Sequence, residues 1–217
     1  SLTQMGTIRL GKRFEQRIPR IRDFVPLAAL DDVVFGGWDV FPESCYQGAL
    51  QAGVLTPEHL EQVRPFLETL KPWPAVFDRN FVKNLDGSHI KPRASHLELV
   101  EAVKRDIETF KRQHSVSRCV MIWCGSTEAY LPPGPEHATL SAFKAGLEAN
   151  APVISPSMLY AYAALSMGIP YINGAPNLTV DIPAMVELAE KHRTVIAGKD
   201  LKTGQTLMKT ILGPGLK

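Results

Sequence analysis

Short apolar runs alternate with amphipathic stretches along most of the chain, which predicts strands and helices in turn. The run Cys119–Cys124 is the clearest strand, because its unbroken apolar character suits the buried middle of a parallel sheet. Shorter apolar runs that end in glycine, proline or an acid predict further strands over 31–39, 73–78, 153–157, 170–175 and 195–198.

The amphipathic stretches carry recognisable helix starts. Thr56 followed by Pro57 supplies a capping hydroxyl and a proline at the first helical position, and Ser95 caps a long stretch with an apolar face. The pattern predicts helices over 43–50, 56–70, 95–111, 139–150, 159–167 and 182–192, with another beginning near Gln205. Strand and helix thus alternate at least five times, which is typical of an α/β fold with a doubly wound parallel sheet.

Composition narrows the class of protein. The 217 residues are 45% hydrophobic and 21% charged, as in ordinary globular proteins, and the formal net charge is only +2 with no long run of one sign. This argues against a nucleic-acid or membrane surface. The chain has no apolar segment of about 18 residues, and the first residues lack a signal-peptide layout. We expect a cytoplasmic protein with reduced thiols at Cys45, Cys119 and Cys124, the last two of them buried.

Several predicted strands end in glycine next to a polar residue. Such turns let a ligand approach the backbone, and the carboxyl ends of parallel strands meet at one edge of the sheet. The pairs are Gly37 with Asp39, Gly125 with Thr127, Gly174 with Asn173, and Gly198 with Asp200. The last turn also presents Lys199, Lys202 and Thr203 before a helix whose first N–H groups we expect to be free. Together these ends predict a ligand crevice.

Two features leave alternatives open. Asp39 suits a carboxylate that accepts hydrogen bonds from a nucleotide ribose, but it equally suits the N-cap of the helix that follows. The basic residues within 1–23 fit a phosphate-facing loop less well than a solvated surface. No GxGxxG turn follows a predicted strand, so a dinucleotide phosphate loop is absent or lies outside this chain. No His, Cys and carboxylate cluster has the spacing of a metal site.

Five segments form a recognisable set in this order along the chain: Gly36–Asp39, Ile122–Glu128, Ile154–Ser157, Tyr171–Pro176 and Gly198–Thr206. Through these segments the chain resembles myo-inositol phosphate synthases. The resemblance implies a Rossmann-type NAD-binding domain over 1–206 and the start of an α+β catalytic and tetramerisation domain at 207–217. It also implies that the glycine-rich loop precedes Ser1 and that the main catalytic lysines follow Lys217.

The activity that the resemblance implies is isomerisation of glucose 6-phosphate to myo-inositol monophosphate in a cytoplasmic homotetramer. A ring-opened carbon is oxidised with NAD, the product enolises, an intramolecular aldol reaction closes the carbocycle, and the hydride is returned. By match to the family's segments, the expected cofactor-binding residues are Asp39, Cys124, Gly125, Thr127, Gly174, Ala175, Asp200 and Thr203. Lys202 is an electrostatic helper at most, because a lysine in a polar turn is more often simply solvated.

This sequence departs from the family at two segments, Cys124–Thr127 and Gly198–Asp200, in a way that indicates a prokaryotic variant. Two other classes of protein stay open: a non-catalytic NAD-binding or assembly module, and an ordinary NAD-dependent sugar-phosphate dehydrogenase. Net NADH accumulation distinguishes the dehydrogenase from the synthase.

Overall fold

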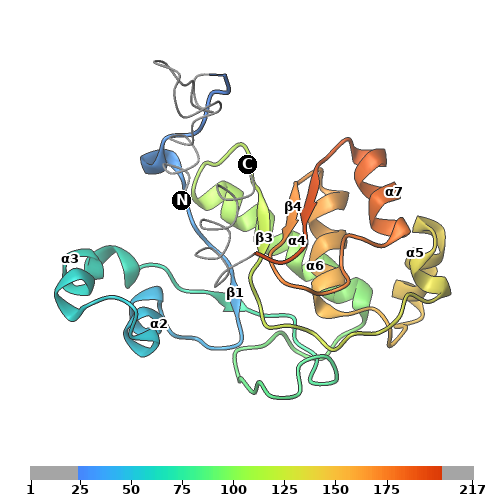
Figure 1. Ribbon diagram of the computed structural model, residues 1–217, viewed down its shortest axis with the longest axis horizontal. Helices are drawn as coiled ribbons and strands as arrows, with labels where there is room; N and C mark the ends of the chain where they lie inside the picture. Colours follow the sequence, from blue (N-terminus) through green and yellow to red (C-terminus); the bar gives the residue numbers. More distant parts are fainter. Residues whose placement is uncertain (1–23, 202–217) are drawn as a thin grey trace, which may run out of the picture. The chain divides into compact units, whose positions relative to one another are not determined.

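The computed structural model describes residues 24–201 (Figure 1). The chain divides into two compact units, Ser1–Phe35 and Gly36–Lys217. In the first unit the described residues form one short 3-10 turn, η2 (Leu30–Asp32), and Val34 and Phe35 are exposed. The basic segment 1–23, the helix expected near Gln205 and the proposed domain boundary lie outside the described residues.

The second unit alternates strands and helices in the predicted order. Its elements are β1 (Trp38–Asp39), α2 (Cys45–Ala52), α3 (Pro57–Leu67), β2 (Trp73–Pro74), α4 (His96–Gln113), β3 (Met121–Trp123), η3 (Pro135–His137), α5 (Leu140–Glu148), α6 (Pro156–Ser166), β4 (Tyr171–Asn173), α7 (Pro183–His192) and β5 (Ile196–Gly198).

The strands form two parallel sheets. β1 pairs with β2, and β3, β4 and β5 pair in that order. The predicted parallel α/β fold is confirmed. One prediction within it is wrong: β4, not β3, is the middle strand, and β3 lies at an edge with Ile122 52% exposed. Cys124 is correspondingly exposed and Cys119 only half-buried, although all three cysteines are free thiols as predicted.

Capping side chains explain where the helices begin. Ser44 and Ser95 each form a capping box with the glutamine or glutamate three residues on, and Thr56 caps α3 ahead of Pro57. Thr139 and Ser155 cap α5 and α6 in the same way. Because Ser44 is the N-cap of α2, the interpretation of Asp39 as that cap is wrong.

Two predicted strands differ from those in the structure. The apolar residues before Gly36 form no strand, and β1 begins only after the glycine pair. Residues 153 and 154 lie in a turn, where the Ile154 N–H donates to the Ala151 carbonyl. Both runs are too short for periodicity to separate a strand from an irregular apolar segment.

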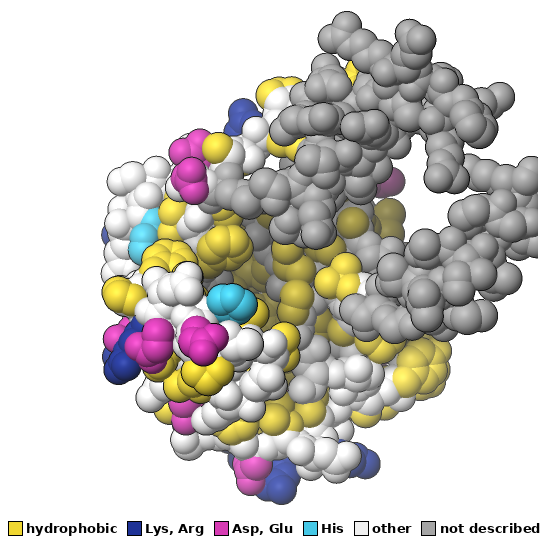
Figure 2. Space-filling view, turned by 60° about the vertical axis from the view of Figure 1, so that its left-hand side comes forward, with side chains coloured by type: hydrophobic (Ala, Val, Ile, Leu, Met, Phe, Trp, Pro, Cys, Tyr) yellow, Lys and Arg dark blue, Asp and Glu magenta, His cyan; other side chains and the backbone are white. Residues whose placement is uncertain are grey.

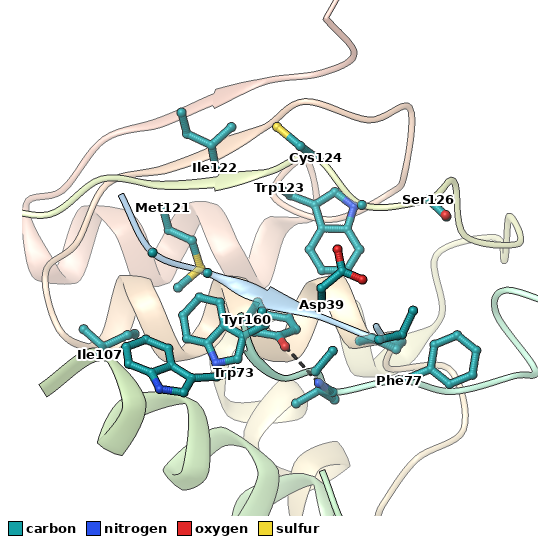
Figure 3. Close-up of a pocket in the computed structure, with 18 of the residues that line it drawn as sticks. Asp39, Trp73, Phe77, Ile107, Met121, Ile122, Trp123, Cys124, Ser126 and Tyr160 are labelled. Carbon is teal, nitrogen blue, oxygen red and sulfur yellow. Dashed lines mark hydrogen bonds between the residues drawn. The ribbon is translucent and has the colours of Figure 1, made fainter. Parts of the chain in front are cut away.

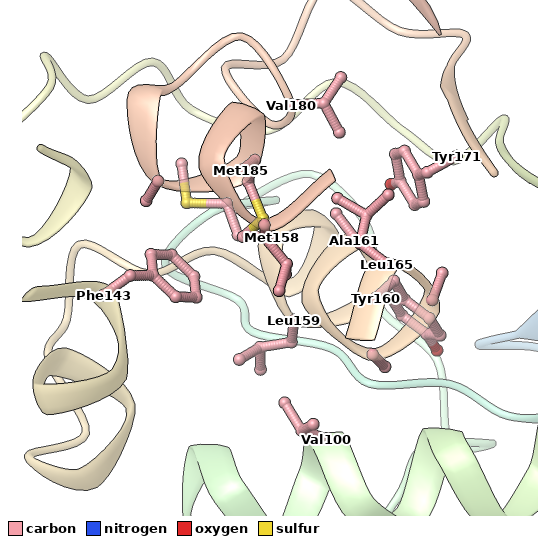
Figure 4. Packing of buried hydrophobic residues seen from close by; sticks show 14 of the residues in the cluster. Val100, Phe143, Met158, Leu159, Tyr160, Ala161, Leu165, Tyr171, Val180 and Met185 are labelled. Atoms are coloured by element: carbon pink, nitrogen blue, oxygen red, sulfur yellow. The ribbon is translucent and has the colours of Figure 1, made fainter. Parts of the chain in front are cut away.

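The core lies between the three-stranded sheet and its helices (Figure 4). α6 is buried almost all round, so its apolar residues show no single face. Val100 of α4, Phe143 of α5 and Met185 of α7 pack around it, with Tyr171 of β4 on the sheet side. This packing fixes the carboxyl ends of β3 and β4.

Candidate functional site

A pocket of about 540 Å³ lies between β1 and β3 (Figure 3). Its walls come from the segments 36–41 and 119–126, and β2, α4 and α6 contribute further residues. We call it the β1–β3 pocket. Its lining is largely apolar and includes two carboxylates: Asp39 is the last residue of β1, and Glu128 follows β3.

Tyr160 of α6 joins the two sides of this pocket. Its ring centroid lies 5.0 Å from that of Trp38 on β1 and 5.6 Å from that of Trp123 on β3. The hydroxyl accepts a hydrogen bond from the Val76 N–H at 2.8 Å (Figure 3). Burial raises the pKa of Tyr160 well above its ordinary value, so the hydroxyl is neutral and serves as a fixed polar anchor.

Asp106 of α4 contacts β1 through the side chain of Trp38. The Trp38 indole Nε1 donates to Asp106 Oδ2 at 2.7 Å, and the Lys91 ammonium donates to the same oxygen at 2.6 Å. The Lys91 side chain is only 10% exposed, so screening by solvent is weak. This charge-assisted contact orients the residue directly before Asp39.

Asp39 itself has an exposed carboxylate at the end of β1. Its Oδ1 accepts from the Phe41 N–H at 3.0 Å, which fixes the side chain in a tight turn. A Cβ built on Gly37 would meet no atom within 4 Å, so the backbone two residues before Asp39 borders open space. These features fit a carboxylate that receives hydrogen bonds from a ligand's hydroxyl groups.

The turn after β3 is held by a buried polar network. Glu128 is 7% exposed, and its two carboxylate oxygens accept from the Ser157 N–H at 2.8 Å and the Ser157 hydroxyl at 2.6 Å. The Ser157 hydroxyl also lies 2.8 Å from that of Thr179. The Glu128 N–H donates to Asn177 Oδ1 at 2.9 Å. The loop from Gly125 to Thr127 is thereby tied to α6 and to the segment after β4.

Burial raises the pKa of Glu128, although the donors from Ser157 and Ser155 partly oppose the shift. The carboxyl therefore holds its proton more firmly than an exposed glutamate does. In the sequence, Glu128 stood out only as part of the family resemblance; its place directly after Ser126 and Thr127 was the available signal for a polar network.

Backbone hydrogen bonds link the segments that follow β4 and β5. The Gly174 N–H donates to the Trp123 carbonyl at 2.9 Å, and the N–H groups of Asp200 and Leu201 donate to the Ala175 and Gly174 carbonyls. The N–H groups of Asp200 and Leu201 are thus used within the sheet edge, whereas the helix start near Gln205, whose N–H groups were expected to be free, lies outside the described residues. Lys199 pairs with Asp181 at 2.8 Å.

The structure brings the predicted residues together in two groups. Asp39, Cys124 and Gly125 line the β1–β3 pocket, while Gly174, Ala175 and Asp200 are linked by hydrogen bonds at the neighbouring strand ends. Thr127 is exposed beside the pocket and is not among its lining residues. Lys202 and Thr203 lie outside the described residues. Which of these residues contact a cofactor stays a prediction.

Within residues 24–201, no group of three or more histidine, cysteine or carboxylate side chains is placed to hold a metal ion. In the same range, none of the helices is long and apolar enough to cross a membrane.

Comparison with known proteins connects this geometry to a family. Residues 1–213 match the family model of an NAD-binding domain described as myo-inositol-1-phosphate synthase. Inositol-3-phosphate synthase 1 of Bacteroides thetaiotaomicron is 48% identical over the whole of this chain, which covers 50% of that protein. Inositol-3-phosphate synthase 1 of Oryza sativa subsp. japonica is 36% identical, and this chain covers 44% of it.

A solved structure agrees with the sequence relatives. The crystal structure of inositol-3-phosphate synthase from Caenorhabditis elegans matches 93% of this chain and 41% of its own, with a TM-score of 0.84 and 30% identity. The chain therefore spans about half the length, or somewhat less, of the relatives that it matches.

Proposed function

The chain belongs to the myo-inositol-1-phosphate synthase family, and on this premise we propose that it is the NAD-binding part of an inositol-3-phosphate synthase. The proposed reaction is the isomerisation of glucose 6-phosphate to myo-inositol monophosphate. NAD, when bound, supplies a hydride acceptor and later the donor, so the isomerisation has no net redox change.

One observation supports this proposal most directly. The carboxyl ends of β1 and β3 lie at the same end of the β1–β3 pocket, with Asp39 on one side and Cys124 on the other (Figure 3). In open parallel sheets, nucleotides bind in a crevice at the carboxyl ends of the strands. Asp39 would accept hydrogen bonds from ribose hydroxyls, and the open backbone at Gly37 leaves room for their approach.

The remaining residues of the chain would position the cofactor. The Glu128 network fixes the turn that carries Gly125 and Thr127, so this wall of the site is rigid before a ligand arrives. Gly174 and Ala175 would border the nicotinamide or pyrophosphate end, as the family resemblance implies. Thr203 and Lys202 keep their proposed roles, as a cofactor contact and a weak electrostatic helper respectively.

The finer proposals follow the family resemblance. We propose that the full-length protein is a cytoplasmic homotetramer and that its product supplies inositol for phospholipid synthesis. Residues 207–217 lie outside the described residues, so the proposed start of the catalytic domain there rests on the resemblance alone.

The decisive experiment incubates the full-length protein with glucose 6-phosphate and NAD. We expect inositol monophosphate without accumulation of NADH. Accumulation of NADH would instead identify a dehydrogenase, and NAD binding without product would leave a cofactor-binding module.

The role of Asp39 is tested in the same protein. Asp39→Asn should weaken NAD binding about 10- to 100-fold, the range for losing hydrogen bonds to a charged group. Glu58→Gln, which removes one charge from the exposed start of α3, is the matched control and should leave NAD binding unchanged. Equal NAD affinity in both variants would remove Asp39 from the site.

A further inference from the structure

Hydrogen bonds that start from Glu128 reach the turns after all three strands of the larger sheet. These turns carry residues that are predicted to bind the cofactor: Gly125 after β3, Gly174 after β4 and Asp200 after β5. Backbone hydrogen bonds already join neighbouring turns at the sheet edge. A chain of side-chain contacts forms a second connection between the turns, and a single buried carboxyl group lies at its centre.

The first contact joins the turn after β3 to α6. Both carboxylate oxygens of Glu128 accept from Ser157, one from its N–H and the other from its hydroxyl. Ser157 is the second residue of α6, so its N–H is among those that the helix itself leaves without a partner. The start of a helix also favours a negative charge. Since α6 is buried almost all round, this contact fixes the turn to the core.

The second contact joins Glu128 to the turn after β4. The Glu128 N–H donates to Asn177 Oδ1 at 2.9 Å. The Asn177 carbonyl accepts from Asn173 Nδ2 at 2.8 Å, and Asn173 Oδ1 accepts from the Ala175 N–H at 3.1 Å. Both asparagines are buried, so water competes little for these bonds. Because the carboxyl group fixes residue 128, it also fixes the N–H on which this turn depends.

The third contact leads from Ser157 to the turn after β5. The Ser157 hydroxyl lies 2.8 Å from the Thr179 hydroxyl, and the Thr179 N–H donates to Asp181 Oδ1 at 3.1 Å. Asp181 Oδ2 accepts from the ammonium of Lys199, the neighbour of Asp200, at 2.8 Å. Thr179 is fully buried, whereas the side chains of Asp181 and Lys199 are 38% and 44% exposed. This third connection is therefore the weakest of the three.

Glu128 differs from the charged residues at the surface. On the face drawn in Figure 2, charged side chains lie outside the hollow around which hydrophobic side chains gather. Glu128 is only 7% exposed and is part of the largely apolar lining of the β1–β3 pocket. A carboxyl group costs free energy to bury unless donors surround it. Because Ser157 donates to both oxygens, the group is suited to holding segments of the chain in place.

We propose that Glu128 is a positioning residue for NAD: its carboxyl group holds the turns after β3, β4 and β5 in the geometry that the cofactor requires, without contacting the cofactor. This inference rests on the proposed function. Segments that are ordered before a ligand arrives lose less conformational entropy when it binds. Loss of the carboxyl group should therefore lower the affinity for NAD by more than the loss of overall stability explains.

Calorimetric titration of the full-length protein with NAD tests the role of the carboxyl group. Glu128→Ala should weaken NAD binding about 10- to 100-fold, because Ser157 loses both acceptors and the turns must be ordered on binding. Glu128→Gln keeps an acceptor for the Ser157 N–H and should stay within about threefold of the unmodified protein. Unchanged affinity in Glu128→Ala, or equal weakening in both variants, would overturn the proposal.

Leu165→Ala separates positioning from a general loss of stability. Leu165 is fully buried in α6 and does not line the β1–β3 pocket. Where all variants are folded, Leu165→Ala should bind NAD within about threefold of the unmodified protein. Weakening as large as that in Glu128→Ala would show that Glu128 acts through stability alone.

Ser157→Ala is the milder variant should Glu128→Ala not fold. It removes only the hydroxyl that donates to Glu128, so NAD binding should weaken about 3- to 10-fold. Unchanged NAD affinity in this variant would count against the positioning role.

Hydrogen exchange without NAD distinguishes this proposal from the proposed function. In Glu128→Ala and Ser157→Ala the amides of Gly174 and Ala175 should exchange at least about tenfold faster than in the unmodified protein. The Tyr171 amide, which donates to the Val195 carbonyl within the sheet, should not change. Faster exchange in a protein that fails to bind NAD would support the connection between the turns and contradict the proposed function. Unchanged exchange would contradict the positioning role even if NAD binds.

Discussion

The two sheets differ in what holds their strands in place. β4 lies between two partner strands, and Tyr171 and Asn173 are fully buried against the helices. β1 and β2 are two residues each, and polar side-chain contacts reinforce them: Trp38 with Asp106, and Tyr160 with the Val76 N–H just after β2. Burial thus stabilises the three-stranded sheet, whereas a few directed contacts position the two-stranded one.

The comparison predicts its largest effect in the packed region. Leu165→Ala on α6 removes a fully buried side chain from the core, so the free energy of unfolding should fall by about 2–5 kcal/mol. Urea unfolding of the chain measures the change. Leu50→Ala on α2, where the side chain is 46% exposed, should change stability by no more than about 0.5 kcal/mol. Equal effects of the two changes would contradict a core centred on α6.

A substitution that removes a contact of the two-stranded sheet should affect mainly that sheet. Asp106→Ala leaves both the Trp38 indole and the Lys91 ammonium without their acceptor, at a cost of about 1–3 kcal/mol. The Asp39 amide in the β1–β2 ladder should then exchange faster, while that of Ile172 in β4 should not.

Glu101→Ala is the matched control for Asp106→Ala, because it also removes an acid from α4 that pairs with a lysine. The Glu101 side chain is 56% exposed, so loss of its pair with Lys104 should cost less than about 1 kcal/mol. If both variants loosened β1 equally, the contact of Asp106 with Trp38 would not be what positions that strand.

These two regions also differ in how far the sequence determines them. Helices with strong caps, such as α4 after Ser95, and the strand around Tyr171 follow from local patterns. The edge position of β3 does not, because its apolar run looks the same whether or not a further strand covers it. Pairing between strands is decided by distant segments, and periodicity carries no information about them.

The candidate site shows the same division. Asp39, Gly125 and Gly174 could be placed at strand ends from the sequence alone, because each follows an apolar run. The contact between Trp38 and Asp106 spans 68 residues, and that between Glu128 and Ser157 spans 29. Such contacts depend on how α4 and α6 pack beneath the sheets, which no local pattern reveals.

The buried carboxyl group of Glu128 should make the stability of the chain depend on pH. Because burial raises the pKa of Glu128 in the folded state, its stabilising contribution is full below the ordinary glutamate pKa and is lost as pH rises through the folded value. Glu128→Gln cannot ionise, so the stability of the unmodified chain should fall relative to this variant as the pH rises above the ordinary glutamate pKa of about 4.3. The difference should be on the order of 1 kcal/mol.

Urea unfolding of both chains across this pH range measures the difference. Glu148→Gln at the exposed end of α5 controls for the removal of one negative charge. A constant difference between the unmodified chain and Glu128→Gln at all pH values would show that ionisation of Glu128 does not limit stability.

The smallest expected effect comes from replacing a helical glycine with alanine, once in the loosely packed α2 and once in the tightly packed α5. Gly48 lies inside α2, and a Cβ there would meet no atom within 4 Å, so Gly48→Ala should stabilise the chain by about 0.5–1 kcal/mol through helix propensity. Gly146 lies inside α5, where a Cβ would come within 3.1 Å of the Ile154 side chain. Gly146→Ala should therefore gain less or lose stability, because the core must yield to admit the methyl group. Urea unfolding compares the two, and an equal gain at both glycines would show that α5 is packed no more tightly than α2.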